Sequence, residues 1–171
     1  MDIKSLMACI DILNGNHEIF SDGEVLGRCY RKYPGAGAAE IERISQKNQI
    51  VFAEDLKRFW MESNGLTFQS FGGTRFFSVE EVSDCLSALE GLLVKGVYPI
   101  AIFDDDTILI DGNRLGSGQY LFFGDISCLE LFYPLDCSFG FFLERMIQLA
   151  GCKYWEPVPD AYVKPVSFLQ D

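Results

Sequence analysis

The chain has 171 residues and a mass of 19.3 kDa, which is the size of one domain. Its 49% hydrophobic residues, with 14% aromatic ones, exclude a disordered chain, because burial of so much apolar surface offsets the entropy lost on folding. The 25 acidic residues outnumber the 14 basic ones and give a net charge of −11. This balance disfavours nucleic acid and anionic membranes as direct partners and favours basic proteins.

The first 37 residues predict one helix followed by irregular chain. Apolar residues recur at helical spacing over 1–13, and Asn14-Gly15 is a suitable helix end. Residues 16–37 mix turn pairs with short apolar pairs, which predicts loops with room for one strand. The N-terminus lacks a small-residue cleavage site, and no uncharged stretch approaches the roughly 18 residues of a membrane span. We therefore expect a cytoplasmic protein without a signal peptide or membrane contact.

Two short amphipathic helices are expected next, in the segments AAEIERISQKN (38–48) and AEDLKRFWMESNG (53–65). In the second segment Leu56, Phe59 and Trp60 lie at positions i, i+3 and i+4. These three side chains share one helical face and should be buried in the core.

Residues typical of turns and helix caps follow the second helix. Asn64 and Gly65 suit a left-handed C-cap, since Asn tolerates a positive φ and Gly adopts it freely. The stretch 74–77 (TRFF) is a candidate short strand. Ser78 then begins S-V-E-E, a capping box in which Glu81 reaches back to the cap. The helix that follows should bury one apolar stripe, made of Val79, Val82, Leu86, Leu89 and Leu93.

The second half of the chain has the pattern of an antiparallel meander. Short apolar runs alternate with the turn sequences DDD, DGN, GSG and GD, and they predict strands at 98–103, 107–110, 119–123 and 128–133. Residues 138–150 return to a helical pattern that Gly151 closes, and the tail from Lys153 contains three prolines and predicts an extended strap. Helices, then a meander, then a last helix predict a single α+β domain.

Four features follow one another along the chain: the helix ending in Asn64-Gly65, the Ser78–Glu81 helix start, the Pro99 strand that enters an acidic turn, and the closing aromatic helix. In this order and spacing they resemble the SUKH superfamily. This group includes fungal Smi/Knr-type cell-wall assembly regulators and bacterial immunity proteins. The resemblance covers 38–151, so we interpret 1–37 as an N-terminal extension of helix and loop, and 152–171 as a C-terminal extended tail.

The resemblance implies a binding module and not a catalyst. Bacterial members look like antidotes that bind and neutralise a cognate polymorphic toxin, often a nuclease, whereas fungal members act as interaction hubs. We therefore expect an immunity protein that needs no catalytic residue, cofactor or metal. The alternatives are a regulatory or scaffolding interaction domain without a toxin partner and, more distantly, a small hydrolase.

The meander is strongly acidic, which links the charge pattern to that role. Between Tyr98 and Asp136 there are seven acidic residues and one basic residue, Arg114. An acidic edge can enter the basic cleft of a nuclease as a mimic of phosphates. The competing interpretation is that aspartates are simply good turn residues. The predicted partner-binding residues are Asp104, Asp105, Asp106, Asp111, Asp125 and Glu130.

Other candidate chemistries are weaker. The DDDTILIDGN stretch lacks the glycine at position six and the closing Glu of an EF-hand, and the glycine-rich stretch 112–118 lacks the ending of a phosphate-binding loop and predicts a hairpin connection. The six cysteines have no C-x-x-C spacing, and with the single histidine His17 they favour reduced core thiols over a nucleophile. Tyr154 and Trp155 could anchor the tail or contact a partner, and we favour the anchor.

Overall fold

The computed structural model describes residues 2–13, 18–21, 24–27, 29–69, 74–103, 105–149, 151, 153–155 and 165–170. Within these residues the chain forms a single α+β domain around a seven-stranded antiparallel sheet. A separate hairpin, β1 (Glu18–Ser21) with β2 (Glu24–Gly27), precedes the sheet. The sheet strands are β3 (Cys29–Lys32), β4 (Leu66–Gln69), β5 (Thr74–Phe76), β6 (Val97–Phe103), β7 (Asp106–Asp111), β8 (Leu121–Gly124) and β9 (Tyr133–Pro134).

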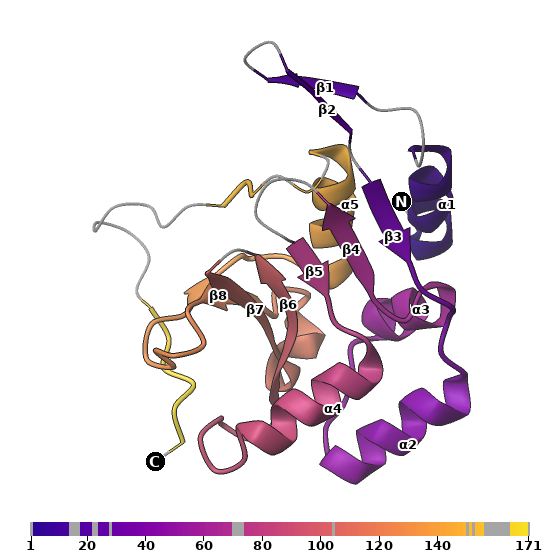
Figure 1. Cartoon of the computed structure of the whole chain (residues 1–171). Coiled ribbons are helices and arrows are strands. Elements are labelled where there is room, and N and C mark those ends of the chain that lie inside the picture. The colour runs from indigo at the N-terminus through magenta and orange to yellow at the C-terminus, as the bar shows by residue number, and fades with distance from the viewer. Residues whose placement is uncertain are drawn as a thin grey trace.

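The seven strands lie side by side in sequence order, so each one pairs with the strand before it. The helices are α1 (Ile3–Leu13), α2 (Ala38–Asn48), α3 (Glu54–Glu62), α4 (Val79–Ala88) and α5 (Phe139–Gln148), with a 3₁₀ helix, η1 (Gly112–Ser117), after β7. In Figure 1, α1 lies at the β3 end of the sheet, α2 and α4 lie along its lower edge, and the C-terminus lies at the opposite end from α1. The predicted α+β meander is therefore confirmed, and it begins earlier in the chain than expected.

Aromatic side chains fill the main core. Phe76 of β5 lies at the centre of this cluster, and its ring centroid is 5.8 to 6.1 Å from five other rings, those of Phe59, Phe68, Phe103, Phe139 and Phe142. Edge-to-face packing of this kind adds about 0.5 to 1.5 kcal/mol per pair beyond the burial of apolar area. The predicted buried face of α3 is confirmed, because Leu56, Phe59 and Trp60 are all fully buried.

The N-terminal 37 residues share the core and sheet of the domain. Four apolar side chains of α1 are buried in the main cluster: Ile3, Leu6, Met7 and Ile10. The prediction of loops with room for one strand over 16–37 is wrong, because this stretch holds β1, β2 and β3. The last of these forms the edge of the main sheet.

Residues 165–170 of the C-terminal tail form a strap that covers part of the sheet face opposite the main core. Isolated bridges join Val166 to Phe132 and Leu169 to Leu93, and the Phe168 ring packs 4.9 Å from the Phe122 ring. A second apolar cluster forms on the outer side of β7 and β8, and it includes Leu93, Phe122, Phe132 and Phe168, with Val166 packed against it. The strand predicted at 128–133 is wrong, since 126–127 and 129–130 are turns and β9 is only Tyr133–Pro134.

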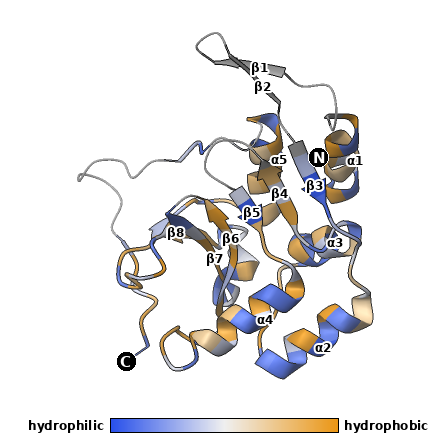
Figure 2. Cartoon of the chain, viewed as in Figure 1, coloured by the Kyte–Doolittle hydropathy of each residue, from blue (hydrophilic) through white to orange (hydrophobic). Residues whose placement is uncertain are grey.

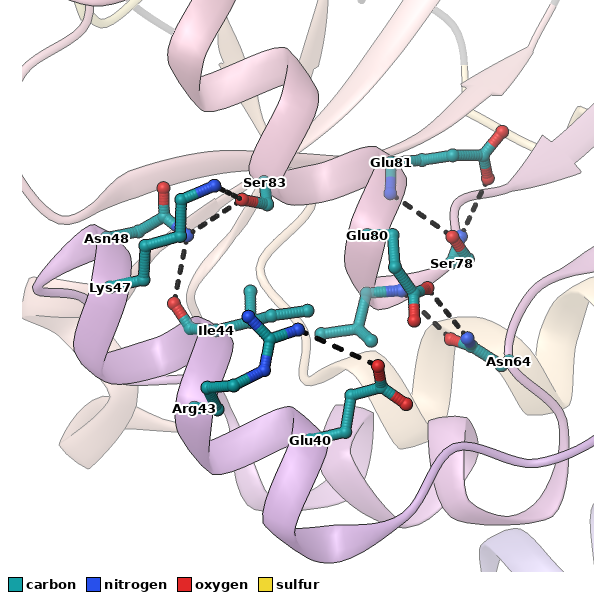
Figure 3. A network of polar contacts seen from close by, with 11 residues as sticks. Glu40, Arg43, Ile44, Lys47, Asn48, Asn64, Ser78, Glu80, Glu81 and Ser83 are labelled. Atoms are coloured by element: carbon teal, nitrogen blue, oxygen red, sulfur yellow. Dashed lines mark hydrogen bonds and ion pairs between the residues drawn. The ribbon is translucent and has the colours of Figure 1, made fainter.

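The predicted capping box at the start of α4 is confirmed. The Glu81 amide donates to Ser78 Oγ (3.1 Å), and the Ser78 amide donates to Glu81 Oε2 (2.8 Å). Val79 and Val82 of the predicted stripe are buried, whereas α4 ends at Ala88 and Leu93 is buried beyond the helix. Figure 3 shows this helix start beside α2, where Lys47 and Asn48 donate to the buried hydroxyl of Ser83 on α4.

The left-handed C-cap predicted at Asn64-Gly65 is wrong. The α3 helix ends at Glu62, and its cap, Ser63, has extended backbone with φ −155°. Asn64 instead binds the first turn of α4, since its Oδ1 accepts from the Val79 amide (2.9 Å) and its Nδ2 donates to Glu80 (2.8 Å; Figure 3). Gly65 has φ +105°, a conformation that favours glycine, in the turn that leads into β4.

Pro99 lies within β6, opposite Leu109 of β7. Proline has no amide hydrogen for the ladder, and the register shifts between Pro99 and Ala101 as a β-bulge. The expected strand that enters the acidic turn is therefore present with a local irregularity.

Candidate protein-binding surface

The strand register brings most of the predicted acidic residues to one end of the sheet. Phe103 pairs with Asp106 across the β6–β7 turn, and Thr107 pairs with Gly124 on β8. The β6–β7 turn and the β8–β9 loop therefore lie at the same end of the sheet. Four residues on these segments, Asp105, Asp106, Asp125 and Glu130, make up what we call the acidic end. Asp104 lies outside the described residues.

Asp106 already has a cationic partner within the chain. Its carboxylate forms an ion pair with Lys153 and accepts a hydrogen bond from Trp155 Nε1 (3.3 Å). The Trp155 side chain is buried and packs 4.8 Å from the Phe103 ring, so the predicted role of Trp155 as an anchor of the tail is confirmed. Asp106 thus holds the tail on the domain.

Asp105, Asp125 and Glu130 are exposed and have no ion-pair partner among the described residues. Asp125 Oδ1 accepts from the Ser127 hydroxyl (2.6 Å) and the Ser127 amide (2.8 Å). These hydrogen bonds to Ser127 lower the pKa of Asp125 and keep the carboxylate ionised. The acidic end therefore presents three uncompensated carboxylates to solvent.

Asp111 lies apart from the acidic end. It ends β7, six residues long, so about 17 Å of strand separates it from Asp106. Its carboxylate is nearly buried, caps η1 through the Asn113 amide (3.0 Å) and pairs with Arg114 (3.2 Å). The described members of the predicted acidic set are thus divided between two ends of the sheet, and Asp111 stabilises a 3₁₀ helix within the expected hairpin connection between β7 and β8.

A polar network that sequence reasoning missed lies near Asp111. Asp55, in the first turn of α3, accepts hydrogen bonds from the Tyr120 hydroxyl (2.7 Å), the Gly140 amide (2.7 Å) and the Leu56 amide (3.0 Å). The Tyr120 oxygen accepts in turn from the Phe139 amide (3.1 Å). One carboxylate therefore ties together the N-termini of α3 and α5, where negative charge is favoured by both helix dipoles.

A hollow of about 380 Å³ opens beside this network and is lined by Val51, Phe52, Ala53, Glu54, Asp55, Arg58, Leu115 and Tyr120. Both carboxylate oxygens of Asp55 are engaged in its hydrogen bonds. The arrangement therefore serves to hold two helices together. The acidic residue in the first turn of a helix was the available signal, but nothing in the sequence linked it to Tyr120.

The buried tyrosines should make stability fall in alkali. Burial raises the pKa of Tyr98 and Tyr120, and Asp55 raises that of Tyr120 further. An unfolded tyrosine loses its proton near pH 10, so above that pH the unfolded state binds fewer protons and is favoured. We expect the free energy of unfolding to decrease by up to about 1.4 kcal/mol per pH unit and per buried tyrosine as the pH rises above 10.

Urea unfolding between pH 8 and 11 measures how the free energy of unfolding changes with pH. Tyr120→Phe should reduce this slope by the contribution of one buried tyrosine. An equal slope in the variant and the wild type would contradict the assignment to Tyr120.

The described cysteines are free, namely Cys9, Cys85, Cys128 and Cys137. Burial raises the pKa of the Cys137 thiol to about 12, so this thiol stays protonated and is a poor nucleophile at neutral pH. Cys29 and Cys152, and His17, have side chains outside the described part of the structure.

Comparison with known proteins identifies relatives. The chain is 31% identical over 139 residues to YnaB of Bacillus subtilis (strain 168), which covers 77% of this chain and 92% of that protein. The chain belongs to the same family as YnaB. A second relative from that strain, YobM, is 26% identical over 129 residues, or 68% of each chain. Both relatives are described as uncharacterized proteins.

No family model matches the chain. Within the described residues, none of the helices combines the length and apolarity needed to cross a bilayer.

Proposed function

We propose that this member of the YnaB family is an immunity protein of the SUKH type, which acts in the cytoplasm by binding and neutralising a cognate toxin. The observation that supports it is the acidic end, where Asp105, Asp125 and Glu130 are exposed without a cationic partner among the described residues. The toxin would be a small basic protein, and a nuclease is the class that such a surface fits best.

Electrostatics supply the mechanism. A nuclease cleft is positively charged because it holds phosphates, and a cluster of carboxylates on a rigid sheet end can occupy that cleft in place of nucleic acid. The net charge of −11 adds a long-range field that accelerates encounter with a basic protein. At physiological ionic strength this field reaches about 8 Å, so association should slow as salt is added.

A charge-neutral variant tests the acidic end. Asp105→Asn, Asp125→Asn and Glu130→Gln together remove three charges at nearly constant size. We expect association with the toxin to slow by about tenfold at low salt, because rim charges mainly affect the association rate. The association rate constant is measured against salt concentration, with the product of the adjacent reading frame as the first toxin to test.

The matched control removes three exposed carboxylates elsewhere, with Glu62→Gln, Asp84→Asn and Glu90→Gln. It has the same net charge, so a general field effect would slow both variants equally. Equal rates in the two variants would remove the acidic end from the mechanism. Failure of the adjacent product to co-purify, or of this chain to restore growth when co-expressed with it, would favour an interaction domain without a toxin partner.

A further inference from the structure

A row of side chains crosses the outer face of the sheet from β3 to β6, where it adjoins the acidic end. Residues that pair directly across antiparallel strands point to the same face. The strand register pairs Arg31 with Thr67, Thr67 with Arg75, Arg75 with Ile102, and Ile102 with Thr107. The buried Tyr30 and Phe68, which alternate with Arg31 and Thr67, belong to the core, so the row faces the side opposite the main core.

Both arginines of this row are held in place by aromatic rings. The Arg31 guanidinium lies 5.2 Å from the Tyr33 ring centroid, and the Arg75 guanidinium lies 5.2 Å from that of Phe77. The Tyr33 hydroxyl is in turn 3.3 Å from Thr67 Oγ1, between the two arginines. Stacking fixes a guanidinium plane and leaves its edge donors available for a planar acceptor.

Arg75 of this row already has a carboxylate partner within the chain. Arg75 donates to Glu81 Oε1 at 2.6 Å, and Glu81 is fixed there by the capping box of α4. Arg31 has no carboxylate partner among the described residues. The row therefore carries a net positive charge on a protein whose overall charge is −11.

The described residues leave this part of the sheet uncovered. Arg31 and Arg75 are exposed, and the apolar side chain of Ile102 is 36% exposed between the strands. Figure 2 shows hydrophilic segments on β3 and β5, and Figure 1 shows no helix in front of these strands. By contrast, the strap with Phe168 covers the outer face of β7 and β8.

We propose that the row Arg31–Thr67–Arg75–Ile102 is a docking surface for an acidic segment of a partner protein. Two strand spacings separate the arginines, which places their Cα atoms about 10 Å apart. A segment with carboxylates at that separation can bind both arginines at once and can place an apolar side chain on Ile102. A polynucleotide fits less well, since two guanidinium groups neutralise few phosphates while the rest of the protein repels the strand.

The arginines of this surface lie on β3 and β5 and are opposite in charge to the acidic end, which adjoins the row at Ile102. The inference stands without the toxin partner proposed above, because it depends only on the row and its charge.

A deca-glutamate peptide is the probe for this surface. We expect weak saturable binding at low salt, with NMR shifts confined to the Arg31 and Arg75 Nε–Hε signals. Arg31→Gln with Arg75→Gln should weaken binding by tenfold or more. The control is Arg58→Gln with Arg145→Gln, which removes two exposed arginines elsewhere, one of them also stacked on a ring, and should leave binding unchanged.

Three results would overturn the proposal. The first is an absence of shifts at Arg31 and Arg75 in the wild-type protein, a measurement that does not depend on the folding of any variant. The second is an equal loss of binding in the control variant. The third is preferential occupation of the same arginines by a decauridylate or by a second copy of the chain, which concentration-dependent sedimentation would reveal.

Discussion

Replacement of Trp60 by alanine is expected to lower the free energy of unfolding by about 3 to 5 kcal/mol, the range for large-to-small substitutions in cores. Trp60 is fully buried on α3 and packs edge-on against Phe52 at 4.8 Å. Its Nε1 donates to the Phe77 carbonyl at 2.9 Å, so truncation leaves a cavity and also a buried carbonyl without its donor.

Trp60→Phe separates these two contributions. It retains most of the ring and loses the hydrogen bond, and we expect a loss of about 1 to 3 kcal/mol. Urea unfolding followed by circular dichroism measures both variants. A loss below about 1 kcal/mol for Trp60→Ala would be inconsistent with a buried core position.

Asp55→Ala is expected to lower the free energy of unfolding by about 2 to 4 kcal/mol. The substitution removes the acceptor for the Tyr120 hydroxyl and the Gly140 amide, at 2.7 Å each, and leaves both donors without that partner. Two helix N-termini also lose their neighbouring negative charge.

Two further variants test whether the stability lost in Asp55→Ala comes from the hydrogen bonds of Asp55. Asp84→Ala removes an exposed carboxylate from α4 and should change stability by less than about 0.5 kcal/mol. Tyr120→Phe removes the donor and leaves Asp55 with its two amide partners, so it should cost less than Asp55→Ala. A loss of equal size in Asp84→Ala and Asp55→Ala would show that the network adds nothing specific.

Local signals predicted the helices well. The spacing of Leu56, Phe59 and Trp60, and the capping box from Ser78 to Glu81, depend on residues within one or two turns, so the sequence contains the whole interaction. Strands β3 and β4 were missed although Leu66–Gln69 alternates apolar and polar residues. Each is only four residues long, and their pairing spans 34 residues or more, so no local pattern specifies it.

Whether a candidate site can be predicted depends in the same way on how far apart its residues lie along the chain. The grouping of the β6–β7 and β8–β9 acids followed from turn sequences and could be predicted. The Asp55–Tyr120 contact joins residues 65 apart, and the row from Arg31 to Ile102 runs across four strands. Such contacts become visible only when the strand register is known. The toxin partner and the SUKH resemblance stay predictions.

The strand order also bears on aggregation. An open sheet has two edges with unpaired backbone groups, and a protein with 15 Phe residues risks joining other copies at those edges. Here the β9 edge is two residues long and ends in Pro134, which has no amide hydrogen to donate. The β3 edge is four residues long and carries Arg31, whose positive charge would repel that of a second copy. The short edge strands, the proline and the positive charge thus prevent this aromatic-rich sheet from pairing edge to edge with the sheet of another copy.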